Sequence, residues 1–183
     1  MHRDESTIIQ RALDGRESAF AELYNRYKNA FFSVCLRYAS HREEAEDYLQ
    51  DGFSKIFREL HQYDSSKGKF YTWATRVIIN CILEGKRKKR ILVSESELIE
   101  YESRFKVDAE VLSQLDLKDV IKALQKLPDG YRTVFNLYFF EDLNHKEVAE
   151  KLGISESTSK TQLMKAKQII REKLSDHLIL SNA

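Results

Sequence analysis

The sequence predicts an all-α fold of two small helical domains, joined by an acidic, flexible linker. Three observations lead to this prediction. The chain of 183 residues has only six glycines and one proline, which is too few turn residues for a fold rich in hairpins. Long stretches place apolar residues at helical steps of three and four. Between them an acidic stretch keeps no such period, which divides the chain into residues 1–90, 91–116 and 117–183.

The composition excludes several other classes of protein. With 42% apolar and 32% charged residues, the chain can bury a core and is neither a fibre nor wholly disordered. Cys35 and Cys81 belong to no CxxC motif and no Cys/His cluster, so we expect two reduced cysteines and no metal site. No stretch approaches the roughly 20 apolar residues of a membrane span. We therefore expect a cytoplasmic protein without direct membrane insertion.

Three helices are expected in the first domain. The apolar residues of 17–38 lie on one helical stripe that faces a core. Residues 40–43 have the Ser-x-x-Glu form of a capping box, and the helical period continues through 45–60. A polar loop at 64–69 then precedes a third helix, which runs from residue 70 into the basic cluster at 86–90.

A second, smaller helical domain is expected after the acidic stretch. The helical pattern resumes at 117–127, Pro128 interrupts it, and a further helix continues through 131–138. The intervening segment 91–116 is acidic, since it contains seven acidic and only two basic residues. This composition is typical of a linker.

The residues that follow have the capping and turn residues of a helix-turn-helix. Asn144 can cap a short helix with Glu147 at its third position, Gly153 can supply the left-handed turn, and Ser155 can cap the next helix. The second helix carries polar and basic side chains that a DNA major groove accepts. Helical hairpins that never touch DNA also use capped glycine turns, so the pattern alone leaves both alternatives open.

Both halves carry motifs that resemble one known family. The chain is similar to the sigma factors of bacterial RNA polymerase, of the small extracytoplasmic-function (ECF) type that retains regions two and four. The resemblance covers about residues 17–90 and 117–174. The matching motifs are LYNRY at 23–27, AEDYLQDGF at 45–53, FYTW at 70–73 and LPDGYRTVF at 127–135, followed by the helix-turn-helix.

The resemblance implies core RNA polymerase as a partner, through the clamp helices of its largest subunit and the flap. The positions that match the docking helix are Asp47, Gln50, Asp51, Phe53 and Phe57. Helical spacing places the three polar residues on one face, away from the apolar stripe. A solvated acidic face is the alternative for these three, and the two phenylalanines are shared between core and interface.

Promoter DNA is the second partner that the resemblance implies. For the minus-ten element, the family uses the loop before the third helix and the exposed face of that helix to unpair the duplex and hold splayed-out bases. Unstacked bases need polar edges and phosphates need cations. The matching positions are Ser66, Lys67, Lys69, Arg76, Asn80 and Arg87. A helical asparagine such as Asn80 is also commonly solvent-facing, and Trp73 is assigned to the core.

For the minus-thirty-five element, the resemblance implies contacts from the second helix of the helix-turn-helix. The matching positions are Ser157, Thr158, Lys160, Thr161, Met164 and Lys165. Lysines give weaker bidentate guanine readout than arginines, so we expect phosphate anchoring from some of them. Arg132 and Lys146 are candidates for DNA-backbone contacts or are surface charges.

These expectations combine into a non-enzymatic initiation subunit with no catalytic residue, cofactor or metal. An anti-sigma protein is a further partner that the resemblance implies. The acidic linker either lies along the positively charged nucleic-acid path of polymerase or is a soluble spacer. An ordinary helix-turn-helix regulator, which binds duplex DNA and never joins polymerase, is the competing hypothesis, although it leaves residues 47–51 and 65–90 without a role.

Overall fold

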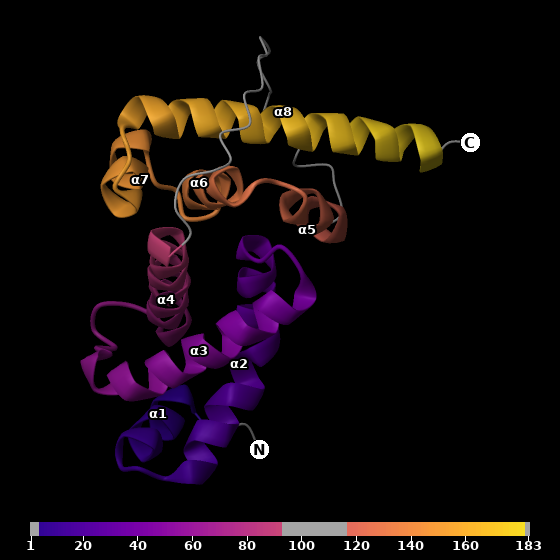
Figure 1. The fold of residues 1–183 in the computed structure, drawn as a ribbon. Helices are drawn as coiled ribbons and strands as arrows, with labels where there is room; N and C mark the ends of the chain where they lie inside the picture. Colours follow the sequence, from indigo (N-terminus) through magenta and orange to yellow (C-terminus); the bar gives the residue numbers. More distant parts are fainter. Residues whose placement is uncertain (1–3, 93–116, 182–183) are drawn as a thin grey trace. The chain divides into compact units, whose positions relative to one another are not determined.

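The computed structural model describes residues 4–92 and 117–181, which form helices and connecting turns with no strand among them (Figure 1). The prediction of an all-α fold is therefore confirmed. The described residues group into two compact units. The first consists of α1, most of α2, α3 and α4, and the second contains α5 to α8. Of the linker predicted at 91–116, residues 93–116 lie outside the described part of the chain.

The first unit contains the three predicted helices and one more. Its elements are α1 (Glu5–Leu13), α2 (Glu17–Tyr38), α3 (Arg42–Glu59), the short 3-10 helix η1 (Leu60–Gln62) and α4 (Phe70–Leu92). Sequence reasoning missed α1, since this helix has nine residues and buries only Ile8, Ile9 and Ala12. So short an apolar face gives little periodicity to detect.

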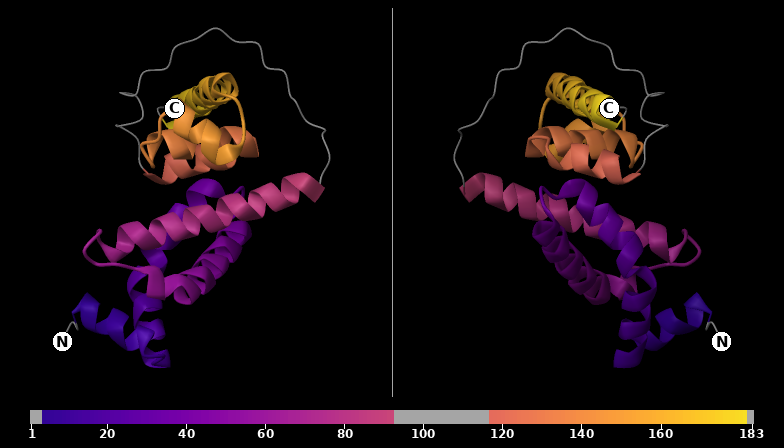
Figure 2. Two further views of the ribbon diagram at one scale, coloured as in Figure 1. Left: turned by 90° about the vertical axis from the view of Figure 1, so that its left-hand side faces the viewer. Right: turned by 90° about the vertical axis from the view of Figure 1, so that its right-hand side faces the viewer.

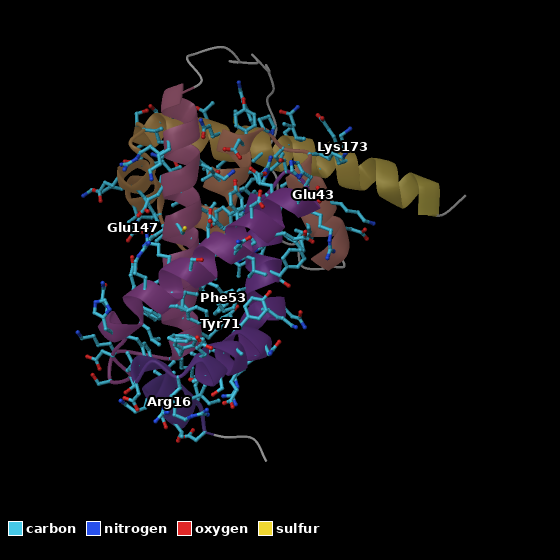
Figure 3. All side chains as sticks on the ribbon, turned by 60° about the horizontal axis from the view of Figure 1, so that its bottom comes forward. Arg16, Glu43, Phe53, Tyr71, Glu147 and Lys173 are labelled. Carbon is cyan, nitrogen blue, oxygen red and sulfur yellow. The ribbon has the colours of Figure 1, made fainter. Side chains whose placement is uncertain are left out.

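The core of the first unit is largely aromatic. Phe31 is fully buried and stacks on Tyr71 with ring centroids 5.6 Å apart, and the ring centroid of Phe53 lies 5.5 Å from that of Phe31. Phe53 and Tyr71, both labelled in Figure 3, thus contact the same buried ring. Aromatic pairs at such distances add to the stability gained by burial alone.

A close approach between α3 and α4 also holds the first unit together (Figure 2). A Cβ atom at Gly52 would lie 2.8 Å from Cγ1 of Ile78, which is fully buried in α4. Lys55 of α3 donates to Glu84 of α4 at 2.8 Å on the same pair of helices. Glycine at position 52 therefore lets the two helix surfaces meet without a gap.

In the second unit, one long helix supports three shorter ones. The elements are α5 (Leu117–Gln125), α6 (Asp129–Phe139), α7 (His145–Leu152) and α8 (Glu156–Ser181). Helix α8 lies along the other three (Figure 1). Its buried Leu163, Ala166 and Ile170 pack into a core with Phe135 and Val148. The predicted break at residue 128 is present as well, with Pro128 at the N-cap of α6.

Arg132 differs from the sequence-based expectation. Its side chain is only 3% exposed, so it is neither a surface charge nor available to a DNA backbone. The guanidinium donates through Nε to the carbonyl of Leu124 at 3.1 Å and through Nη2 to that of Leu127 at 2.8 Å. Arg132 therefore closes the turn between α5 and α6, where the last carbonyls of a helix need partners.

Candidate functional site

The acidic face predicted on α3 is exposed. Asp47, Gln50 and Asp51 all lie at the surface, whereas Ala45 and Ile56 of the same helix are buried. Residues three and four apart share a helix face, so the three polar side chains form one ridge. We call Asp47, Gln50 and Asp51 the acidic ridge.

Beside this ridge lies a groove of about 380 Å³ with an apolar floor. Its lining residues are Tyr24 from α2 and Glu46, Leu49, Gln50, Phe53, Ser54 and Phe57 from α3. The ring of Phe53 is 4.7 Å from that of Tyr24 and 5.6 Å from that of Phe57. Gln50 belongs to both the ridge and the groove. An apolar floor with a carboxylate rim suits a helix that carries both apolar and basic side chains.

The two phenylalanines have different exposure. Phe53 is 4% exposed and forms part of the groove floor from within the core, while Phe57 is half-buried. Tyr24 was expected in the core-facing stripe of the first helix, but 39% of its surface is exposed. Periodicity placed it on the correct side of α2 but could not show that α3 leaves this edge of the stripe uncovered.

Every residue of the loop at 64–69 is exposed. The carboxylate of Asp64 accepts hydrogen bonds from the backbone N–H of Ser66 at 2.9 Å and from its hydroxyl at 2.7 Å. The amine of Lys67 lies 3.4 Å from the same carboxylate. The hydrogen bonds from Ser66 and the charge of Lys67 hold the pKa of Asp64 below its usual range. Lys69 is the third predicted contact and is also exposed.

The exposed face of α4 continues from this loop. Arg76, Asn80 and Arg87 are all exposed, and their spacing of four and seven residues places them on one side of the helix. Trp73 was assigned to the core, but it is only half-buried, with its ring beside those of Tyr63 and Phe70. The structure therefore brings the six predicted minus-ten positions onto one loop and the adjoining helix.

The helix-turn-helix has the caps that the sequence predicted. The side chain of Asn144 accepts from the N–H groups of Lys146 and Glu147, and Glu147 accepts in return from the Asn144 N–H at 2.8 Å. Gly153 takes the left-handed conformation with φ at 65°. The hydroxyl of Ser155 accepts from the N–H of Thr158 at 3.0 Å and so caps α8. These local bonds fix where α7 and α8 begin.

The first turns of α8 present the predicted minus-thirty-five positions. Ser157, Lys160, Thr161 and Met164 are exposed, while Thr158 and Lys165 are half-buried. Lys146, the other predicted backbone contact, is exposed at the start of α7. The first turns of α8 thus carry hydroxyl, ammonium and thioether groups, which are the kinds of group that contact phosphates and base edges.

Two features of this region were not predicted from the sequence. Glu156 lies 2.7 Å from the amine of Lys160, which holds the pKa of Glu156 below its usual range. Ser159 is fully buried, and its hydroxyl is 3.0 Å from Nδ1 of His145. Helical spacing could indicate the first pair, which lies one turn apart, but the second joins two different helices.

The two cysteines form no disulfide among the described residues. Cys35 is buried and Cys81 is half-buried. Within the described residues, no group of three or more histidine, cysteine or acidic side chains could hold a metal ion. In the same part of the chain, no helix is long and apolar enough to span a membrane.

A capped helix-turn-helix with basic and hydroxyl side chains on its second helix is typical of transcription proteins that bind DNA. Comparison with known families agrees. The family model for sigma-70 region 2 matches residues 23–91, and the model for sigma-70 region 4 matches residues 117–170. The chain belongs to the ECF RNA polymerase sigma factors, a family of transcription initiation factors.

Individual relatives match over most of the chain. It is similar to the ECF sigma factor SigM of Bacillus subtilis, with 31% identity over 153 residues, covering 82% of this chain and 91% of the relative. It is also similar to SigW of Bacillus subtilis, with 29% identity over 179 residues, covering 92% and 95%. The sigma factor RpoE of Bartonella quintana, solved with the anti-sigma factor NepR, shares the fold at a TM-score of 0.50 with 22% identity, covering 85% and 96%.

Proposed function

We propose that this protein binds core RNA polymerase, directs it to promoters through two DNA contacts and assists melting. The observation that carries the proposal is that one chain has both an acid-rimmed apolar groove and a capped helix-turn-helix. A protein partner suits the groove and duplex DNA suits the helix-turn-helix. Catalysis stays with polymerase, and the protein works in the cytoplasm.

The acidic ridge and the groove are assigned to polymerase. Asp47, Gln50 and Asp51 supply charge and hydrogen bonds to the clamp helices of the largest subunit, and Phe53 and Phe57 supply apolar contact. Ridge charges mainly favour encounter and orientation, whereas the desolvated aromatic floor contributes most of the affinity.

The DNA contacts are divided between two domains, at residues 1–90 and 117–183, with 91–116 as the linker. Residues of the loop and α4 hold the minus-ten element, and α8 enters the major groove at the minus-thirty-five element. These assignments rest on the exposure of Lys69, Arg76, Asn80 and Arg87 in the first unit and of Lys160 and Met164 in the second.

An anti-sigma protein is proposed as the regulator. The support is the relative RpoE, which was solved in complex with an anti-sigma factor. Such a protein would prevent initiation by covering the groove of α2 and α3, because polymerase needs the same apolar floor.

Reconstituted transcription tests this function. The protein is mixed with purified core polymerase and a library of promoter fragments, and transcripts are sequenced. We expect specific transcripts that vanish when either component is omitted and that decline steeply with salt, since phosphate contacts release counterions. Absence of both a complex with core and any specific transcript would contradict the proposal. Tight duplex binding without polymerase would favour an ordinary helix-turn-helix regulator.

A further inference from the structure

The side chain of Tyr63 contacts both the end of the loop before α4 and the first turn of α4. The hydroxyl of Tyr63 donates to the carbonyl oxygen of Gly68 at 3.1 Å. Its ring is held edge-on against Phe70 and beside Trp73, with both pairs of centroids 5.5 Å apart. Because Phe70 is fully buried, this tyrosine joins the end of the loop to a buried residue in the first turn of α4.

Asp64 makes a second set of contacts, which lie inside the loop. Asp64 binds the N–H and hydroxyl of Ser66 through Oδ1, and its other oxygen lies 3.4 Å from the amine of Lys67. The backbone N–H of Lys67 also donates to the carbonyl of Asp64 at 3.1 Å. Two of the three predicted base-contacting side chains in this loop are therefore already engaged within the loop itself.

Among the described residues, the loop makes one further backbone hydrogen bond, from the N–H of Trp73 in α4 to the carbonyl of Lys69 at 3.2 Å. All its residues are exposed, and Gly68 has a φ of 151° with no atom within 4 Å of the position of a Cβ. Ordering one residue costs roughly 1–2 kcal/mol of conformational entropy. A loop that is ordered before it meets its ligand avoids this cost and rejects ligands that do not fit its shape.

We propose that Tyr63 and Asp64 are positioning residues that hold the loop in one shape and so determine which base it accepts in the minus-ten element. This inference rests on the proposed assignment of the loop to that element. Neither residue needs to touch the base. Each acts through the atoms that it holds: Tyr63 through the Gly68 carbonyl, and Asp64 through Ser66 and Lys67.

Transcription by the reconstituted holoenzyme tests the proposal. The template is a promoter library in which each minus-ten position carries all four bases, and the readout is the ratio of transcripts for the best and the second-best base. Tyr63→Phe removes the hydroxyl but keeps the ring contacts, so we expect this ratio to fall about fivefold at the position that the loop reads. Asp64→Ala is expected to lower it further. Asp64→Asn keeps an acceptor for Ser66 and should restore part of the discrimination.

Tyr71→Phe is the matched control. Tyr71 (labelled in Figure 3) lies on the first turn of α4, is 41% exposed and stacks on Phe31, and among the described residues no hydrogen bond joins its hydroxyl to the loop. We expect this variant to keep the wild-type base preference. Hydrogen exchange at the amides of Ser66 and Lys67 should quicken in Tyr63→Phe and Asp64→Ala and stay unchanged in Tyr71→Phe.

The outcomes separate this inference from the proposed function. If wild-type holoenzyme gives promoter-specific transcripts whose base preference survives both Tyr63→Phe and Asp64→Ala, the inference is overturned and the function stands. An equal loss of transcription from every promoter also overturns it, because that indicates a merely structural role. Wild-type holoenzyme without any specific transcript overturns the proposed function and this inference with it.

Discussion

At Gly52 a hydrogen atom stands where any other residue would place a carbon against Ile78 of α4. The missing side chain sets the spacing of two helices whose facing surfaces are buried. Gly85, also helical, has nothing within 4 Å of its Cβ position. The same change at these two glycines therefore has opposite consequences.

We expect Gly52→Ala to lower the free energy of unfolding of the first unit by about 1–3 kcal/mol, because the added methyl group overpacks a filled core. Chemical denaturation monitored by circular dichroism measures this. Gly85→Ala is the control, and it should leave stability unchanged or raise it by up to about 1 kcal/mol, since alanine favours helix. Equal effects of the two changes would contradict the close approach of α3 and α4.

His145 is a titratable residue that packs inside the helix-turn-helix. Burial lowers its pKa, with a further contribution from the charge of Lys160 and opposition from Glu156. Its ring lies 4.8 Å from that of Tyr138, and its Nδ1 contacts the buried Ser159. The folded state therefore favours the neutral imidazole.

Since the pKa of His145 is lower when folded than when unfolded, the unfolded state binds the proton more tightly. Stability of the second unit should be greatest above the unfolded pKa of about 6.5 and should fall as the pH drops below it. We expect a lower free energy of unfolding at pH 5.5 than at pH 7.5, measured by denaturation of the full chain with a probe in this unit. His145→Gln, which cannot titrate, should reduce the difference; an unchanged difference would exclude His145 as its source.

At the scale of elements, the boundaries of α7 and α8 depend on short polar side chains. Asn144 and Glu147 satisfy each other's backbone groups, and Ser155 caps α8. Such bonds join residues two or three positions apart, so their pattern is visible in the sequence. Helices α2, α3 and α4 are also visible in the sequence, because their long apolar stripes repeat every three or four residues.

Asn144→Ala should destabilise the helix-turn-helix by about 1 kcal/mol, because N–H groups at the start of α7 lose their acceptor. Denaturation of the full chain measures the change, and binding to a minus-thirty-five duplex should weaken in parallel. Glu150→Ala, at an exposed position of the same helix, should change stability by less than about 0.5 kcal/mol. A comparable loss in both variants would argue against the capping box.

At the scale of the whole molecule, the two units carry surfaces of different charge, and we propose that these surfaces bind two different partners. The acidic ridge lies on α3 of the first unit, and Lys160 and Lys165 lie on α8 of the second. A net charge of +1 conceals this division. Because each surface belongs to its own unit, a charge reversal on one should spare the other.

Asp51→Arg should weaken binding to core polymerase at least tenfold and leave binding of the minus-thirty-five duplex unchanged, because it places a cation where we propose that a basic partner docks. Lys165→Glu should do the reverse, since it repels DNA phosphates. Fluorescence anisotropy with labelled core and labelled duplex measures the two affinities, and each variant is the control for the other. Loss of the same affinity in both variants would refute the division of roles.

By itself, the sequence determined the all-α class, the long helices and the caps of the helix-turn-helix, because periodicity and capping act over three or four residues. Tertiary structure alone decided that Arg132 is buried, that Tyr24 opens onto a groove and that His145 reaches Ser159. These outcomes depend on which helix covers which face, and hence on packing between residues far apart in the chain. The shape of the loop at 64–69 lies between the two: its residues mark a turn, but the bond from Tyr63 to Gly68 appears only once α4 fixes the tyrosine ring.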